Sequence, residues 1–156
     1  AEMVRQTGCA GVVVGRGCLG RPWLFADLVE SFSGGDNRVL PTLHEVREVM
    51  FRHGELIVDY FESEDRGCRD LRKHMAWYLK GFRVNSELRR QFGMVGSLKE
   101  LRSLLDQLDD QPYPVEIGEK PRGRTSSGRP PTLPDGWLND PDEMIHLDAE
   151  DMFSGG

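Results

Sequence analysis

The chain has 156 residues, 38% of them hydrophobic and 29% charged, and its formal net charge at pH 7 is −6. Its three cysteines include no C-x-x-C pair, which argues against a disulfide framework or a zinc site and is typical of a reducing compartment. No apolar run is long enough to span a membrane. We expect a cytoplasmic, monomeric protein that holds no metal ion.

The first residues of the chain predict a helix end, a strand and a glycine-rich turn. Residues 1–8 resemble the last turns of a helix, with Gly8 as its C-cap. Residues 11–14 form a β-branched run, as expected for a strand that is covered on both faces. Gly15, Gly17 and Gly20 follow, and then a short helix over residues 23–32. A strand that runs into such a turn and a helix start can hold a phosphate on backbone N–H groups.

This turn fits more than one architecture. The three glycines match the G-x-G-x-x-G pattern of a Rossmann dinucleotide site, but the acidic candidate Asp36 lies in a loop without a preceding strand. The last strand of a (β/α)8 barrel fits better, because its phosphate site is built from the loops after strands seven and eight. A tight turn without a ligand remains the third interpretation.

Residues 42–110 predict a small helical bundle. Thr42 and Glu45 form a capping box that begins a long amphipathic helix to about residue 62. A second helix is expected over residues 65–80, a third from Ser86, and a fourth after Ser97 that is lined by leucines as far as Leu108. The inward side of the second helix should carry these residues: Cys68, Leu71, Met75, Tyr78 and Leu79.

The helical pattern ends after Asp110. Residues 111–156 hold seven of the nine prolines, nine acidic side chains and four basic ones, so that they carry a net charge of −5. We expect this acidic, proline-rich tail to be largely disordered.

Positive charge is concentrated in residues 66–90. This segment holds eight Lys or Arg against two acids, a local charge of +6 in an acidic chain. Arg66, Arg69 and Lys73 are spaced to share one helical face, with Arg72 beside them and His74, Trp77 and Tyr78 interleaved. Clustered cations bind phosphates with release of counterions, and nearby rings can stack on bases. Structured RNA is one expected partner, and a solvated helix face above core aromatics is the alternative.

Two segments together resemble the tRNA-dihydrouridine synthase family, in its bacterial B-type branch. Residues 13–25, VVGRGCLGRPWLF, resemble the family's GRGALGNPWLF segment at the end of its flavin barrel, and residues 72–81, RKHMAWYLKG, resemble its RKH-x-x-WY-x-KG segment. The resemblance implies an oxidoreductase that binds FMN in a TIM barrel, takes hydride from NADPH and reduces a tRNA uridine to 5,6-dihydrouridine. It further implies that Gly15, Arg16 and Gly17 hold the FMN phosphate. It assigns tRNA binding to a basic set: Arg66, Arg69, Arg72, Lys73, His74, Lys80 and Arg83.

The resemblance also sets limits. Cys18 and Arg21 stand where the family usually has Ala and Asn, and none of Cys9, Cys18 or Cys68 matches the family's catalytic cysteine, so no catalytic residue is assigned here. The expected fold class is an α/β (β/α)8 TIM-barrel remnant over residues 1–38, a small all-α helical tRNA-binding bundle over residues 39–110, and a disordered C-terminal tail over residues 111–156. We expect this chain to be a C-terminal fragment, inactive in dihydrouridine synthesis by itself. A non-enzymatic RNA-binding module, a fragment of another flavin TIM-barrel oxidoreductase and a non-functional truncation product are the alternatives.

Overall fold

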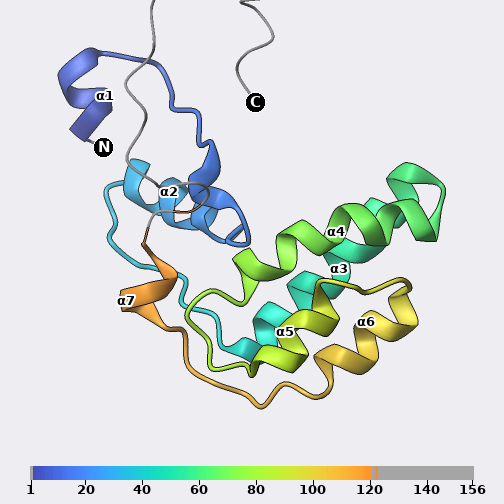
Figure 1. Ribbon diagram of the computed structural model, residues 1–156. Helices are drawn as coiled ribbons and strands as arrows, with labels where there is room; N and C mark the ends of the chain where they lie inside the picture. Colours follow the sequence, from blue (N-terminus) through green and yellow to red (C-terminus); the bar gives the residue numbers. More distant parts are fainter. Residues whose placement is uncertain (1, 121, 123–156) are drawn as a thin grey trace, which may run out of the picture. The chain divides into compact units, whose positions relative to one another are not determined.

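A computed structural model of the chain describes residues 2–120 and Arg122. Every described residue belongs to one compact unit. All regular elements among the described residues are helical (Figure 1). They are α1 (Glu2–Thr7), the 3₁₀ turn η1 (Arg16–Cys18), α2 (Leu24–Phe32), α3 (Leu43–Phe61), α4 (Glu64–Tyr78), α5 (Ser86–Phe92), α6 (Leu98–Leu105) and α7 (Val115–Gly118).

The strand predicted over residues 11–14 is absent from the described structure, so the sequence prediction was wrong there. A strand needs a neighbour to pair its backbone N–H and C=O groups, and the described residues offer none. Val13 is fully exposed as a result. Residues 2–38 therefore contain only the helical elements α1, η1 and α2. The helix before this segment does form, and Gly8 ends it in the left-handed region at φ +66°.

The helices α3 and α4 form the centre of the bundle, and α5 and α6 cover them. Glu62, at φ 49°, and Ser63 make the tight turn between α3 and α4. Gly67 lies so close to α3 that a Cβ placed on it would be 2.7 Å from the Cα of Val58. The predicted inward residues of α4 are confirmed as buried, and they pack with a larger set from the other helices: Leu43, Val46, Met50, Phe92, Leu101 and Leu105.

Side-chain caps set the starts of α3, α4, α5 and α6, and the one at Thr42 was predicted from the sequence. The Thr42 and Glu45 capping box is present in full, and α3 begins at the next residue, Leu43. Ser97 caps α6 by accepting from the N–H of Glu100, but the Glu100 carboxylate accepts from the N–H of Gly96, one residue before the cap. The α6 helix ends at Leu105, three residues earlier than expected.

Residues 111–120 and Arg122 are ordered against the bundle, which corrects the prediction that the tail begins at residue 111. The carbonyl of Gln111 accepts from the N–H of Leu43, and its side-chain amide bonds both backbone groups of Arg83. Tyr113 is buried, edge-on to the rings of Trp23 and Phe82. We call residues 111–120 together with Arg122 the clasp. The remainder of the predicted tail, residues 123–156, lies outside the described residues.

Candidate functional site

The glycine-rich loop reaches the bundle through Gly20. Gly20 has φ +61°, and a Cβ placed on it would be 2.4 Å from the backbone carbon of Trp77 and the nitrogen of Tyr78. Only glycine fits both the conformation and the contact. The loop is thereby pressed onto the C-terminal end of α4, so the two segments that resemble family motifs meet in space.

The predicted phosphate-binding residues form an exposed edge of this loop. Gly15, Arg16 and Gly17 are exposed, and a Cβ placed on Gly15 would meet nothing within 4 Å. The loop therefore leaves open space beside its backbone, and an arginine side chain lies between the two glycines. These properties fit a phosphate group, which takes backbone N–H donors together with a guanidinium.

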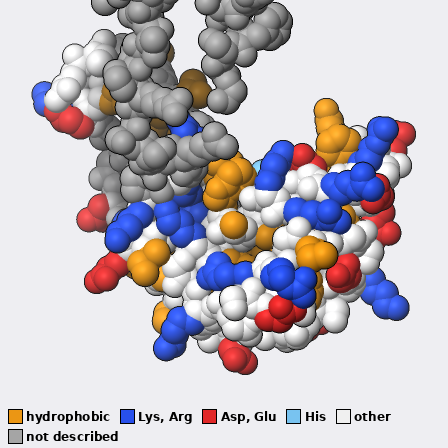
Figure 2. Space-filling view, viewed as in Figure 1, with side chains coloured by type: hydrophobic (Ala, Val, Ile, Leu, Met, Phe, Trp, Pro, Cys, Tyr) orange, Lys and Arg blue, Asp and Glu red, His pale blue; other side chains and the backbone are white. Residues whose placement is uncertain are grey.

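The α4 helix presents an exposed basic face of Arg66, Arg69 and Lys73, which lie three and four residues apart on one side. Arg69 pairs with Asp65 at 3.0 Å and Lys73 with Asp70 at 2.6 Å. Arg69, Asp65 and Lys73 are exposed and Asp70 is part-buried, so water screens both pairs and an incoming phosphate can replace the carboxylates at little cost. Figure 2 shows Lys and Arg side chains gathered on this side of the bundle.

Two arginines of the basic segment have internal roles that the sequence did not reveal. The Nε of Arg72 donates to the carbonyl of Val95 at 2.9 Å, which ties α4 to the loop before α6. Arg89 donates to the carbonyls of Leu79, Phe82 and Val84. Charge counting cannot find such roles, because the carbonyls lie up to 23 residues away in sequence.

Lys80 and Arg83 lie beyond the end of α4, beside the clasp. The Nζ of Lys80 donates to the carbonyl of Lys120 at 2.9 Å, and Arg83 is exposed. Desolvation, followed by the charges of Arg122 and Lys120, lowers the pKa of Lys80. Lys80 and Lys120 thus lie close together, and Arg83 is bonded to the clasp through its backbone and Gln111, so these cations lie apart from the basic face of α4.

His74 belongs to a row of rings rather than to the exposed basic face. Its ring lies 4.7 Å from that of His53 and 5.2 Å from that of Trp77, and its side chain is 17% exposed. Burial, then the neighbouring His53 and Lys73, lowers its pKa to about 4. His74 is therefore neutral at pH 7 and contributes a ring, not a cation.

We expect the free energy of unfolding to depend on His74 below neutral pH. The pKa of His74 is about 4 in the folded chain against an ordinary 6.5, so between these values the unfolded chain binds a proton that the folded chain does not. Lowering the pH from 7 to about 4.5 should remove about 2 kcal/mol of stability through this group. Urea unfolding across that range measures it. A His74→Gln variant should flatten the dependence, and an unchanged slope would contradict the assignment.

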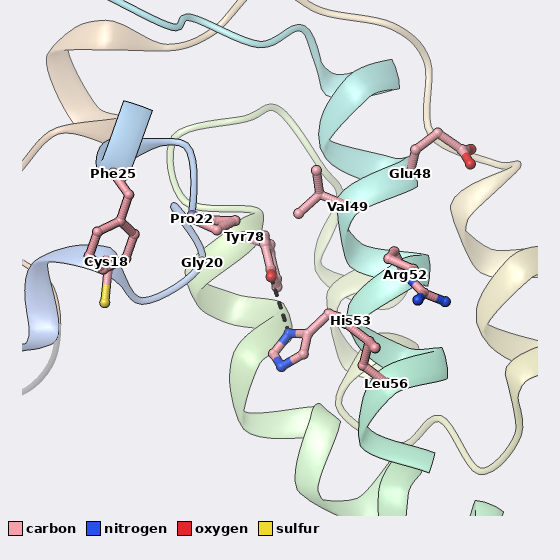
Figure 3. A pocket seen from close by; sticks show the side chains of 10 residues that line it. All are labelled: Cys18, Gly20, Pro22, Phe25, Glu48, Val49, Arg52, His53, Leu56 and Tyr78. Atoms are coloured by element: carbon pink, nitrogen blue, oxygen red, sulfur yellow. Dashed lines mark hydrogen bonds between the residues drawn. The ribbon is translucent and has the colours of Figure 1, made fainter. Parts of the chain in front are cut away.

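A pocket of ≈ 510 Å³ opens between the glycine-rich loop, α3 and the end of α4 (Figure 3). Its lining residues are Cys18, Gly20, Pro22, Phe25, Glu48, Val49, Arg52, His53, Leu56 and Tyr78. Inside it the hydroxyl of Tyr78 and the Nδ1 of His53 are hydrogen-bonded at 3.1 Å. Burial raises the pKa of Tyr78 to about 12, so the hydroxyl keeps its proton. The sequence alone did not indicate this pocket, because its walls come from three separate segments.

The sequence profile of the dihydrouridine synthase family matches residues 1–113. The chain belongs to this family. A Mycobacterium leprae protein named "Probable tRNA-dihydrouridine synthase" is 52% identical over 99% of the chain, and its Mycobacterium tuberculosis counterpart is 51% identical over 99%. Pasteurella multocida tRNA-dihydrouridine synthase B is 39% identical over 60% of the chain and 28% of its own length. The chain spans 40% of the length of the two mycobacterial relatives.

The ordered part of the chain extends beyond the residues that the family profile matches. The dihydrouridine synthase profile ends at residue 113, whereas the ordered clasp continues through α7 to Arg122. Within the described residues no helix has the length and apolarity needed to cross a membrane. The same residues contain no group of three His, Cys, Asp or Glu side chains suited to a metal ion.

Proposed function

We propose that this chain provides the tRNA-binding helical bundle and part of the cofactor site of a tRNA-dihydrouridine synthase. The proposed reaction is the FMN-dependent, NADPH-driven reduction of a tRNA uridine to 5,6-dihydrouridine. Membership of the dihydrouridine synthase family supports this, and the exposed basic face of α4 is the observation that carries the tRNA part.

For the cofactor, the residues that fit best are Gly15, Arg16 and Gly17. They would hold the phosphate of FMN through backbone N–H groups and the Arg16 guanidinium, and bound FMN would supply the hydride. The contact of Gly20 with Trp77 and Tyr78 then fixes this edge relative to α4. In this arrangement the chain's own residues bind and orient, and we assign no proton transfer to any of them.

For the tRNA, we propose two groups of cations. Arg66, Arg69 and Lys73 would contact phosphates along α4, and Lys80 and Arg83 would extend the contact toward the clasp. Arg72 supports this surface from behind through its bond to Val95, and His74 supports it through its ring contacts. We therefore assign these two a positioning role within the proposed interface.

The test replaces Arg66, Arg69 and Lys73 together by serine. We expect the dissociation constant for tRNA at 100 mM salt to rise by more than about 30-fold and the salt dependence to become shallower, because each lost phosphate contact removes a released counterion. A triple serine variant of Arg5, Arg90 and Lys99 is the control, since it removes the same charge from exposed positions elsewhere. Equal weakening of tRNA binding in both variants would mean that only the net charge matters, which would contradict a specific binding surface on α4.

A flavin-free RNA-binding module is the second candidate. It is favoured by one observation, that the helical bundle packs a core of its own without any strand among the described residues. Absorbance in the flavin region of the protein isolated from its native source separates the two, because only a synthase would carry FMN.

A further inference from the structure

We propose that the pocket between α3, α4 and the glycine-rich loop binds one unstacked nucleobase of the RNA that lies on the basic face of α4. This inference rests on the proposed RNA-binding function and deepens it. It names a site for a base in addition to the surface for phosphates. The base meant here is a second one, besides the uridine that the proposed reaction reduces.

The walls of the pocket suit a flat ring. Leu56 and Phe25 are 50% and 51% exposed at the pocket, while Val49 and Tyr78 are more deeply placed behind them. Single-stranded and looped RNA is commonly held by splaying a base onto apolar and aromatic side chains. Figure 3 shows side chains from the loop and from α3 on facing sides of this space.

The pocket also carries a polar pair that can read a base edge. His53 and Tyr78 share one hydrogen bond, and burial lowers the pKa of His53, so the imidazole is neutral at pH 7. If the Tyr78 hydroxyl donates, the pair retains the Nε2–H donor and the phenolic oxygen acceptor. If His53 donates, it retains the hydroxyl donor and the Nε2 acceptor. In both cases one donor and one acceptor remain, which matches the alternation along a base edge.

The charges around the pocket favour a base over a phosphate. The charges that α3 places at the rim cancel, because Arg52 pairs with Glu55 at 3.1 Å and Glu48 with Arg102 at 2.8 Å. The α4 face instead holds three cations against the two carboxylates of Asp65 and Asp70, and its Lys73 directly precedes His74. The row of rings from Trp77 through His74 to His53 connects that face with the pocket. The positive α4 face is thus suited to phosphates, and the charge-balanced pocket is suited to a base.

The first experiment compares Leu56→Asp with Tyr60→Asp in the full 156-residue chain. Both side chains lie on α3 and both are exposed, but only Leu56 lines the pocket. Each variant adds one carboxylate to the same helix, so general repulsion of RNA is matched. A stacked base contributes about 1–3 kcal/mol, so Leu56→Asp should weaken tRNA binding about tenfold or more. Tyr60→Asp should change it less than about twofold. Equal effects would overturn the proposal.

The second experiment titrates the chain with the four nucleoside 5′-monophosphates and with ribose 5-phosphate, followed by the NMR methyl signals of Val49 and Leu56. Shifts caused by the nucleotides and not by ribose 5-phosphate support a base pocket. Equal shifts from the nucleotides and from ribose 5-phosphate overturn it. The absence of any shift also overturns it and would favour an apolar protein segment as the occupant of the pocket. Failure of the proposed function is distinguishable, since the chain would then lack salt-dependent tRNA binding altogether, whatever the nucleotides do.

Discussion

Gly67→Ala should destabilise the bundle by about 3 kcal/mol or more, at the strong end of overpacking effects. In a helix this substitution normally stabilises by about 1 kcal/mol, because alanine is the better helix former. Here the added methyl would lie 2.7 Å from both the Cα and the Cγ2 of Val58 and 2.9 Å from its nitrogen. Backbone atoms cannot rotate away, so α3 and α4 must separate along the interface that holds the core.

Thermal and urea unfolding measure this effect, and Gly96→Ala is the matched control. A Cβ on Gly96 would meet only the Oε2 of Glu100, at 3.6 Å, which is an ordinary contact. We expect Gly96→Ala to leave the melting temperature nearly unchanged and Gly67→Ala to lower it by more than about 10 °C. Similar small shifts in both variants would mean that the helices can move apart freely, contrary to the packing described.

The helical bundle could be predicted because its signals are local. The capping box at Thr42, the side-chain cap at Ser97 and the apolar spacing of α3 and α4 each lie within a few turns of one helix, whereas the cap at Ser63 was missed. The prediction of a strand over residues 11–14 was wrong for a physical reason. Its β-branched residues specify burial between layers, but pairing must come from other strands, and the described residues supply none.

The sequence could predict only those parts of the candidate site that depend on residue type and local spacing. The exposed face of Arg66, Arg69 and Lys73 follows from helical spacing, but the internal bonds of Arg72 and Arg89 depend on carbonyls brought together by the fold. The clasp was missed because proline and acidic content predict disorder. Its order comes from tertiary contacts, such as Pro114 packed on Gly81, which holds φ +88°.

The clasp also explains a departure from the family pattern. Arg21 occupies a position where the resemblance leads us to expect asparagine, and its side chain is only 10% exposed. Its Nη2 lies 3.5 Å from the Oδ2 of Asp27 and 3.4 Å from the Oε1 of Glu119, a residue beyond the end of the family match. Glu119 also pairs with Arg38. The unusual arginine therefore has its partner in the segment that the family profile leaves out.

Glu119→Gln should accordingly destabilise the folded chain by about 2 kcal/mol, because it leaves one largely buried arginine with a single carboxylate and a second arginine without its partner. Glu116→Gln is the control, since Glu116 is exposed on α7, the short helix that Glu119 directly follows. If the pairing with Arg21 is the cause, Arg21→Asn should reduce the cost of Glu119→Gln, and the double variant should be more stable than the sum of the single effects predicts. Hydrogen exchange of residues 16–24 provides a second readout, which should accelerate in Glu119→Gln and not in Glu116→Gln. Strict additivity of the two substitutions would show that Glu119 acts through Arg38 alone, and the clasp would then hold α2 and the following loop without fixing the glycine-rich loop at Arg21.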